Sequence, residues 1–309
     1  MACTATPDLE VQLHRCTPIP ASRACATAFV MNGEAYVFGG RDSVGHELND
    51  LWRYDPETDS WTSLGTTPLK PRVNATSCTH GDKVYLGLGF KGAYAVDSCY
   101  YRDWWEYTPA TNQWKRLANY PNPYTDKATA FTGDGELYVG YGFCYHYRRD
   151  MFRYTIAEDR WDSIDVQVSM HGFPDRSFGG TGCTCQNRHF MGSGFFGKSL
   201  DWWAELVDGT HWEKRSSIPG KPRTLSASTA TNNYIYVVGG LHYGGVNTTQ
   251  DVMRDIRRYD PTNDSWTYVA VLPEGVFNHC CFAIGKQVFV GMGETLDEKF
   301  NKTLYRFEE

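Results

Sequence analysis

A repeat with a period of about 50 residues runs through this chain and limits what it can fold into. One element of the repeat is a tryptophan that recurs at nearly even spacing. The five tryptophans are Trp61, Trp114, Trp161, Trp212 and Trp266. A strand-like stretch such as residues 51–54 stands upstream of each one, and a further copy at residues 304–307 ends the chain. Repeats of this length bury their apolar faces against neighbouring copies, so we expect one repetitive array.

A second repeated element is a short apolar strand that closes on glycine. Its six copies begin at Tyr36, Tyr85, Tyr138, Phe190, Tyr236 and Phe289. Glycine allows the close backbone approach that strands near a propeller axis require. An apolar strand, Gly-Gly, a loop, Tyr-Asp-Pro and then Trp resembles the kelch repeat, and the likeness covers nearly the whole chain. Four copies depart from the pattern by using Gly-x-Gly.

The two ends of the chain complement each other. The last repeat stops after its third strand, and no tryptophan strand follows it. Residues 11–14 supply the missing strand, because Leu13 stands in the same relation to Ile19-Pro20 as Trp212 does to Ile218-Pro219. We therefore predict an all-β, six-bladed kelch-type β-propeller with four-stranded blades, in which the N-terminal strand closes the last blade. Residues 1–8 are predicted to be a tail and residues 9–309 a single propeller domain.

Composition excludes several function classes. The formal net charge of −6 and pI of about 5.9 argue against general attraction to nucleic acid. No apolar run approaches the length of about 18 residues that a transmembrane helix needs. The ten cysteines include no C-x-x-C pair, so no zinc ribbon or thioredoxin-type motif is expected. Most are expected to be buried thiols, while a disulfide between Cys99 and Cys144 is an open alternative that would imply export.

The first residues admit two interpretations. Ala2-Cys3 is compatible with the remnant of a lipoprotein processing site, which would give a lipid anchor at Cys3. The alternative is an ordinary start followed by a solvated tail. The Tyr-Asp-Pro repeats resemble those of exported bacterial kelch proteins, and this resemblance implies an extracytoplasmic location.

A cation recurs in the loop that leads into each repeat. Arg23, Arg72 and Arg223 occupy one register relative to the glycine strands, Lys127 and Arg176 fall near it, and His279 stands nearby in the last copy. If these groups converge at one end of the channel, they would bind a carboxylate or another anion. The alternative is that each arginine pairs with a carboxylate or the backbone of its own repeat.

The loops after the glycine strands are rich in aromatic and histidine side chains. The candidates for ligand contacts are Tyr94, Tyr101, Tyr145, His146, Phe196, His242 and Tyr243. Such side chains suit the faces of sugar rings, and they equally suit a polypeptide partner. A third possibility is that they only fill the channel opening.

Glu294 is the one carboxylate that directly follows a Gly-x-Gly. In this respect Gly293-Glu294 is similar to the sialic acid mutarotase branch of kelch proteins, where such a glutamate is a base near arginines. Residues 295–299 contain no arginine, and no long inserted loop is evident, so the chain departs from that branch. Gly-x-Ser-x-Gly, P-loop and His-Glu-x-x-His motifs do not occur, and no metal or other cofactor is expected.

Three functions follow from these features. The first is a non-catalytic binding protein that holds a carbohydrate or an anionic small ligand at the channel opening. The second is a cofactor-free sugar mutarotase or epimerase in which Glu294 moves a proton and Arg23, Arg72 or Arg223 holds a carboxylate. The third is a scaffold for protein interactions. The fold itself does not choose between them.

Overall fold

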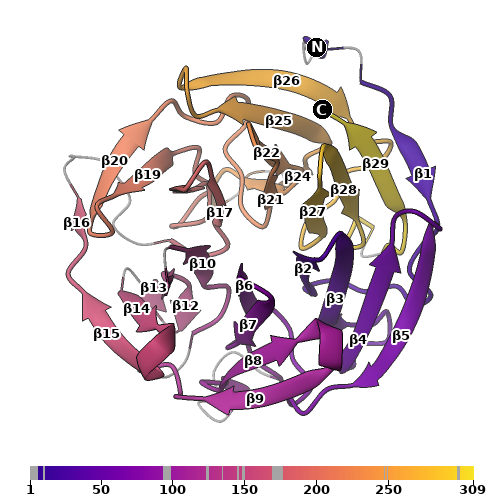
Figure 1. The fold of residues 1–309 in the computed structure, drawn as a ribbon. Helices are drawn as coiled ribbons and strands as arrows, with labels where there is room; N and C mark the ends of the chain where they lie inside the picture. Colours follow the sequence, from indigo (N-terminus) through magenta and orange to yellow (C-terminus); the bar gives the residue numbers. More distant parts are fainter. Residues whose placement is uncertain are drawn as a thin grey trace.

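The computed structural model describes residues 6–9, 11–92, 99–122, 125–133, 135–144, 146–147, 150–168, 177–246, 248, 250–297 and 300–309. Six antiparallel sheets stand around a central axis like the blades of a propeller, as Figure 1 shows. In each blade the first strand lies nearest the axis and the fourth lies at the rim.

The first three blades each have four strands. Blade one contains β2 (Thr27–Met31), β3 (Glu34–Arg41), β4 (Glu47–Asp55) and β5 (Ser60–Thr66). Blade two contains β6 (Thr76–His80), β7 (Lys83–Gly87), β8 (Trp104–Thr108) and β9 (Gln113–Leu117). Blade three contains β10 (Thr129–Thr132), β11 (Glu136–Gly140), β14 (Met151–Thr155) and β15 (Arg160–Ile164).

The other three blades repeat this order. Blade four contains β17 (Thr181–Cys185), β18 (Arg188–Gly192), β19 (Trp203–Val207) and β20 (His211–Arg215), and β16 (Gln167–Val168) adds a short parallel strand beside β20. Blade five contains β21 (Ala227–Ala230), β22 (Ile235–Val238), β25 (Asp255–Asp260) and β26 (Ser265–Val271). Blade six contains β27 (Cys280–Ile284), β28 (Gln287–Gly291), β29 (Leu304–Glu308) and β1 (His14–Cys16).

Short elements decorate the loops between the blade strands. Two small hairpins follow second strands: β12 (Phe143–Cys144) with β13 (His146–Tyr147), and β23 (Leu241–Tyr243) with β24 (Gln250–Val252). The 3₁₀ turns η2 (Pro109–Thr111) and η3 (Ile156–Glu158) join third to fourth strands. Within the described ranges, no helix has the length and apolar character needed to span a bilayer.

The strand that closes the ring lies slightly later in the chain than residues 11–14. His14, Arg15 and Cys16 pair with Arg306, Tyr305 and Leu304 of β29, so the N-terminal strand completes blade six as predicted. The preceding residues do not join this ladder, because their apolar side chains have another place to pack. Leu9, Val11 and Leu13 lie against the apolar cluster between blades five and six.

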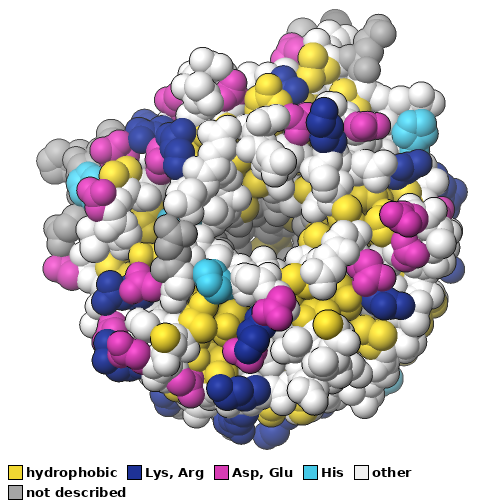
Figure 2. Space-filling view, viewed as in Figure 1, with side chains coloured by type: hydrophobic (Ala, Val, Ile, Leu, Met, Phe, Trp, Pro, Cys, Tyr) yellow, Lys and Arg dark blue, Asp and Glu magenta, His cyan; other side chains and the backbone are white. Residues whose placement is uncertain are grey.

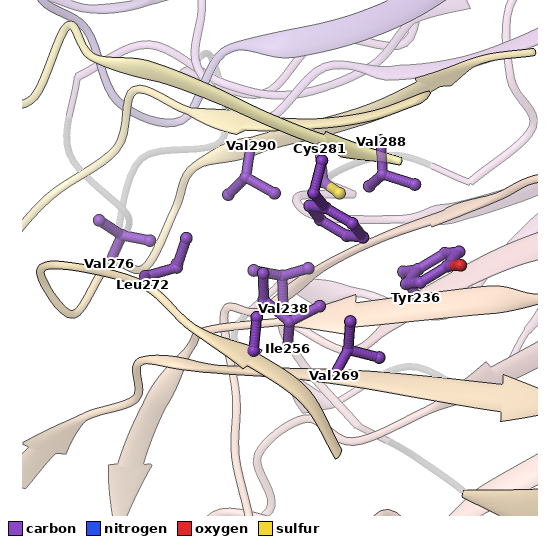
Figure 3. Close-up of a cluster of buried hydrophobic side chains, with 11 residues drawn as sticks. Tyr236, Val238, Ile256, Val269, Leu272, Val276, Cys281, Val288 and Val290 are labelled. Carbon is purple, nitrogen blue, oxygen red and sulfur yellow. The ribbon is translucent and has the colours of Figure 1, made fainter. Parts of the chain in front are cut away.

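The core consists of apolar clusters between neighbouring blades. In the cluster shown in Figure 3, Val238 and Ile256 of blade five face Val288 and Val290 of blade six, and Cys281 lies among them. All five side chains are at least nine-tenths buried. Burial of one large apolar side chain contributes about 1.5–3 kcal/mol, so these contacts between sheets hold the ring together.

The repeated tyrosine, aspartate and tryptophan form one cross-blade contact. In blade three the Tyr154 hydroxyl donates to Asp159 Oδ1 at 2.7 Å, and the same oxygen accepts from the Ala118 backbone N–H of blade two at 2.8 Å. Trp161 Nε1 donates to the Ala118 carbonyl at 3.0 Å. Blades one and five repeat the contact through Asp59 and Asp264. The repeated aromatic residues therefore have an architectural role.

The last position of each glycine strand is glycine for a steric reason. Gly40 has a φ of +92°, and a Cβ there would lie 2.6 Å from the Ala24 carbonyl oxygen. The position before it is also left-handed in every blade, but it accepts larger residues such as Leu88 and Tyr141, with φ of 59° and 60°. This tolerance explains why Gly-Gly and Gly-x-Gly copies build the same turn.

Candidate functional site

One end of the central channel, called the mouth here, is formed by two sets of loops. One set leads into each first strand, and the other set follows each second strand. Isolated backbone bridges tie the two sets together in all six blades, for example Ala24 with Arg41 and Phe277 with Glu294. Figure 2, which has the same view as Figure 1 and faces the side of the turns between third and fourth strands, shows a hollow at the centre of the ring, with cationic and anionic side chains in small groups around it.

Six left-handed residues surround the axis at the mouth and form what we call the inner ring. They are Cys25, Asn74, Lys127, Gly179, Leu225 and Asn278, with φ between 51° and 61°. Backbone hydrogen bonds join ring members of successive blades, such as Asn74 N–H to Cys25 O and Cys25 N–H to Asn278 O, both 2.9 Å. These bonds hold side chains of different chemistry at fixed positions over the channel.

A cavity of about 490 Å³, called the mouth pocket here, opens beside the inner ring. Its walls come from blades one, five and six. The lining residues are Arg41, Ser43, Val44, Gly45, Leu241, Gln250, Phe277, Glu294, Thr295, Leu296 and Phe300. A volume in this range accommodates a small molecule or a few residues of a polypeptide. The pocket combines apolar and neutral polar side chains with one guanidinium and one carboxylate.

Glu294 is a half-buried residue of this pocket, and hydrogen bonds orient it. Asn278 Nδ2 donates to Glu294 Oε1 at 3.1 Å, while Asn278 Oδ1 accepts from Lys127 Nζ at 2.8 Å. The Cys25 thiol also points to Glu294 Oε1 at 3.8 Å. Burial raises the pKa of that thiol to about 12, so Cys25 stays protonated. Both donors, Asn278 and Cys25, therefore contact the same carboxylate oxygen of Glu294, Oε1.

The three aligned arginines do not form an open cationic ring. Arg23, Arg72 and Arg223 are fully buried, and each makes a bidentate ion pair with a carboxylate of its own blade. The partners are Asp50, Asp103 and Asp255, at 2.7–2.9 Å. Each arginine also donates to a carbonyl at the end of the glycine strand. Of the two interpretations that the sequence left open, the structure therefore shows local pairing.

Asp103 illustrates the electrostatics of these pairs. Burial raises the pKa of this carboxyl, but the two hydrogen bonds and the positive charge of Arg72 outweigh that effect and hold the pKa below its ordinary value. Arg223 and Arg257 likewise hold the pKa of the Asp255 carboxyl below its ordinary value. Both carboxylates are therefore ionised at neutral pH, and the arginine charge is neutralised inside the blade.

Lys127 and His279 lie at the axis and not in the arginine register. Lys127 belongs to the inner ring, and its Nζ lies 5.0 Å from the centre of the Phe178 ring. His279 lies one residue after the ring and is 6% exposed. It lines a cavity of about 150 Å³ at the mouth and a second of about 230 Å³ along the channel. Burial lowers the pKa of His279 to about 3, so the imidazole is neutral.

The predicted aromatic contacts are dispersed. Tyr101 covers the buried guanidinium of Arg72, with 4.3 Å between them. Phe196 is exposed in blade four, and Tyr243 lies against Phe195 at 5.7 Å. His242 Nδ1 lies 2.7 Å from the Pro222 carbonyl oxygen. None of these four lines the mouth pocket.

Some candidates cannot be placed. Tyr94, Tyr145 and Arg176 lie outside the described residues, and so does the side chain of His146. Cys3, the predicted lipid attachment point, is also outside them. Cys99 is a free thiol in the structure, and the side chain of Cys144, its partner in the alternative disulfide, lies outside the described residues.

Arg41 and Asp126 are two residues that the sequence analysis missed. Arg41 occupies the position in blade one that Glu294 occupies in blade six, directly after the last glycine, so reading that position across the copies would have found it. Asp126 precedes the inner ring in blade three. Its buried carboxylate accepts no hydrogen bond of standard geometry from the described residues. A lone aspartate in a loop carries no sequence signal for such burial.

The chemistry open to the mouth pocket is ligand binding or proton transfer. Glu294 can accept hydrogen bonds or a proton, and Arg41 can donate to an acceptor. In the described part of the chain, no three His, Cys, Asp or Glu side chains are grouped to hold a metal ion.

Comparison with protein families finds two matches. The model described as the KLHDC2/KLHL20/DRC7 Kelch-repeats domain matches residues 3–194. The model described as the Kelch motif matches residues 222–272. Together they cover most of the repeats identified in the sequence.

Individual proteins show more distant similarity. Human Kelch-like protein 23 is 26% identical over 252 residues, which are 81% of this chain and 42% of that protein, so the chain spans less than half of this relative. N-acetylneuraminate epimerase of Yersinia enterocolitica is 31% identical over 101 residues, or 31% of this chain and 25% of that protein. A solved structure described as YjhT superimposes with a TM-score of 0.76 over 95% of this chain and 99% of the other, at 16% identity. That last likeness concerns the fold alone.

Proposed function

The chain belongs to the kelch-repeat β-propeller family, and from this premise we propose that it is a non-catalytic binding protein that holds a segment of a partner polypeptide at its mouth. The fold supplies a rigid ring of loops, and such rings place binding residues on a stable scaffold. The mouth pocket is the proposed centre of the binding surface.

The observation that carries this proposal is the distribution of exposed apolar side chains. Four large apolar side chains project from loops that follow second strands, in blades one, four, five and six. They are Val44, Phe196, Val246 and Leu296, which are 77%, 48%, 83% and 61% exposed. Val44 and Leu296 also line the mouth pocket. Exposed apolar groups gathered on one side of a protein favour a protein partner.

A carbohydrate or anionic small ligand is less well supported. The arginines expected to hold an anion are paired within their blades. Among the aromatic side chains expected to stack on sugars, the described ones, Tyr101, Phe196 and Tyr243, do not line the mouth pocket. Both features remove reasons for a small acidic ligand, and neither counts against a polypeptide.

The experiment is selection from a phage library of short random peptides, followed by measured affinities of the selected peptides. We expect Val44→Asp and Leu296→Asp each to weaken binding by about tenfold or more, because a carboxylate replaces an apolar contact. Thr62→Asp is the matched control, since it adds the same charge on the exposed outer strand of blade one. Failure to select any peptide, or equal affinity of all three variants, would contradict the proposal.

A sugar mutarotase is a second candidate, favoured by the oriented carboxylate of Glu294 and by the similarity to N-acetylneuraminate epimerase over a third of the chain. In this reaction Glu294 would take the proton of the anomeric hydroxyl and give it to the ring oxygen as the ring C–O bond breaks, and the reverse transfer on the other face of the carbonyl would reclose the ring. The check is exchange between N-acetylneuraminate anomers, followed by NMR. Acceleration that disappears in Glu294→Gln would establish catalysis and displace the binding proposal; the binding proposal expects no acceleration.

Export and lipid attachment at Cys3 remain a proposal of the same kind. They have support from the Ala2-Cys3 pair and from the resemblance of the repeats to exported kelch proteins. Mass spectrometry of the protein from its native cells would detect the lipid.

A further inference from the structure

The charged residues at and near the mouth pocket differ in whether another side chain pairs with them. Arg41 Nη2 lies 3.7 Å from Glu47 Oε1, so Arg41 has an ion-pair partner in its own blade. Lys127 lines the inner cavity and not the mouth pocket, and its Nζ donates to Asn278 Oδ1 at 2.8 Å. Within the described residues, the Glu294 carboxylate forms no ion pair and accepts hydrogen bonds only from the side chains of Asn278 and Cys25.

The hydrogen bonds to Glu294 leave its other oxygen available. Asn278 and Cys25 both approach Oε1, and no donor to Oε2 is found in the described part of the chain. Asn278 cannot turn its amide around without losing the bond from Lys127, because its Oδ1 is the acceptor of that bond. Asn278 is therefore a positioning residue that keeps one oxygen of Glu294 directed at a ligand.

The walls of the pocket suit a long side chain with a charged end. Leu241, Phe277 and Phe300 line the same cavity as Glu294. Lysine and arginine have aliphatic stems that pack on apolar surface while their charged ends bind carboxylates, and their cations are also attracted to aromatic faces. An acidic side chain in the pocket would instead be repelled by Glu294, whose carboxylate has no ion-pair partner among the described residues.

We infer that the mouth pocket is a specificity pocket for a basic group, namely a lysine or arginine side chain of the bound polypeptide, with Glu294 as its partner. This inference rests on the proposed polypeptide binding and adds the chemistry of the residue that enters the pocket. It reverses the sign of the ligand charge expected from the sequence, because the arginines that led to that expectation are neutralised inside the blades.

The test is peptide selection on the wild-type protein and on Glu294 variants. The wild type is expected to select peptides that share a lysine or arginine at one position next to apolar residues. Replacing that basic residue by glutamine, or making Glu294→Gln, should each weaken binding by about tenfold or more. The two losses should not add in the doubly changed pair, because both remove the same contact. Glu294→Lys should select peptides with an acidic residue instead.

The controls separate local from general effects. Glu274→Gln removes another carboxylate of the loop that leads into blade six, where the side chain is exposed, and should leave the affinity unchanged. Circular dichroism and thermal unfolding of each variant establish that it is folded. Affinity for the basic peptide should also fall as ionic strength rises.

The results of the peptide selection distinguish the inference from the polypeptide-binding proposal on which it rests. Selected peptides with a basic residue whose effect depends on Glu294 support the inference. Selected peptides without a basic preference, or an affinity that Glu294→Gln leaves unchanged, overturn the inference but leave the polypeptide-binding proposal standing. Selection of no peptide at all overturns both.

Discussion

At the position before the inner ring, five blades place a neutral side chain and blade three places Asp126. The neutral residues are Ala24, Val73, Phe178, Thr224 and Phe277. Asp126 is fully buried, and burial raises its pKa to about 7 although the charge of Lys127 acts in the opposite direction. A buried carboxyl is costly where the surrounding groups compensate only in part for the loss of water, and such features gather at functional sites more often than elsewhere.

The raised pKa predicts a pH dependence of stability. The folded protein binds the Asp126 proton more tightly than the unfolded chain, whose value is near 3.8. The unfavourable contribution is therefore fully present above pH 7 and disappears as the pH falls toward 4. We expect Asp126→Asn to raise the free energy of unfolding at pH 8 by on the order of 2–4 kcal/mol and to change it little near pH 4.

Urea unfolding at several pH values measures this effect as the difference between variant and wild type. His279 also makes stability depend on pH: because its pKa is lowered in the folded state, both proteins lose stability as the pH falls below 6.5. Subtracting the wild-type value from the variant value removes this shared contribution. A difference that does not vary with pH would show that Asp126 is ionised normally.

The buried arginines show how one residue type acquires a structural role. A buried ion pair does not by itself raise stability much relative to apolar residues, but loss of one partner leaves an unpaired buried charge, which destabilises by about 3–5 kcal/mol. Arg23 and Arg223 each join a leading loop to the third strand of the same blade, and Arg72 joins its loop to Asp103, the residue directly before that strand. They hold the mouth loops in position without contacting a ligand.

At the scale of elements, the blades are joined by the contact of tyrosine, aspartate and tryptophan. The aspartates Asp59, Asp159 and Asp264 have φ of 48°, 48° and 49°, which directs each carboxylate back toward the preceding blade. Blades one, three and five are thus linked to the preceding blade by hydrogen bonds at the rim as well as by apolar packing nearer the axis. This combination fixes the angle between neighbouring sheets.

The closing strand β1 gives an element-level prediction. Removing residues 1–16 takes β1 away from β29 and also removes Leu9, Val11 and Leu13 from the cluster between blades five and six. The free edge of β29 would then pair with other chains. We expect a lower melting temperature and the appearance of oligomers in size-exclusion chromatography.

A protein shortened by residues 1–7 is the control, because the first described backbone contact begins at Asp8, whose N–H donates to Tyr268 O at 2.7 Å. It should stay monomeric and melt like the full chain. If the longer truncation behaves in the same way, β1 does not close the ring in solution.

At the scale of the whole molecule, the fold separates structural from binding residues. Apolar clusters and rim contacts lie between the blades, and the channel is lined by small and hydroxyl side chains such as Thr27, Thr76 and Ser228. The mouth loops carry the exposed apolar groups and Glu294. Variation in these loops can change the ligand without disturbing the ring.

The sequence predicted the fold well and the site only in part. The register of Arg23, Arg72 and Arg223 was correct, but their partners were not identified, because Asp50, Asp103 and Asp255 lie 27–32 residues further along the chain. Glu294 could be singled out because it directly follows a repeated glycine; it lines the mouth pocket, and its role in a site stays a prediction. The Asn278 and Lys127 contacts that orient Glu294 could not be predicted, because Lys127 is 151 residues from Asn278 and comes from another blade.

What the sequence by itself determined was the number of blades, the order of their strands, the left-handed glycine turns and the closure by an N-terminal strand. These features depend on local patterns that recur six times, and repetition makes such patterns visible. Only the tertiary structure decided which charges remain open at the mouth. That outcome depends on pairs formed inside blades and on a pocket whose walls come from blades one, five and six, which become neighbours only when the ring closes.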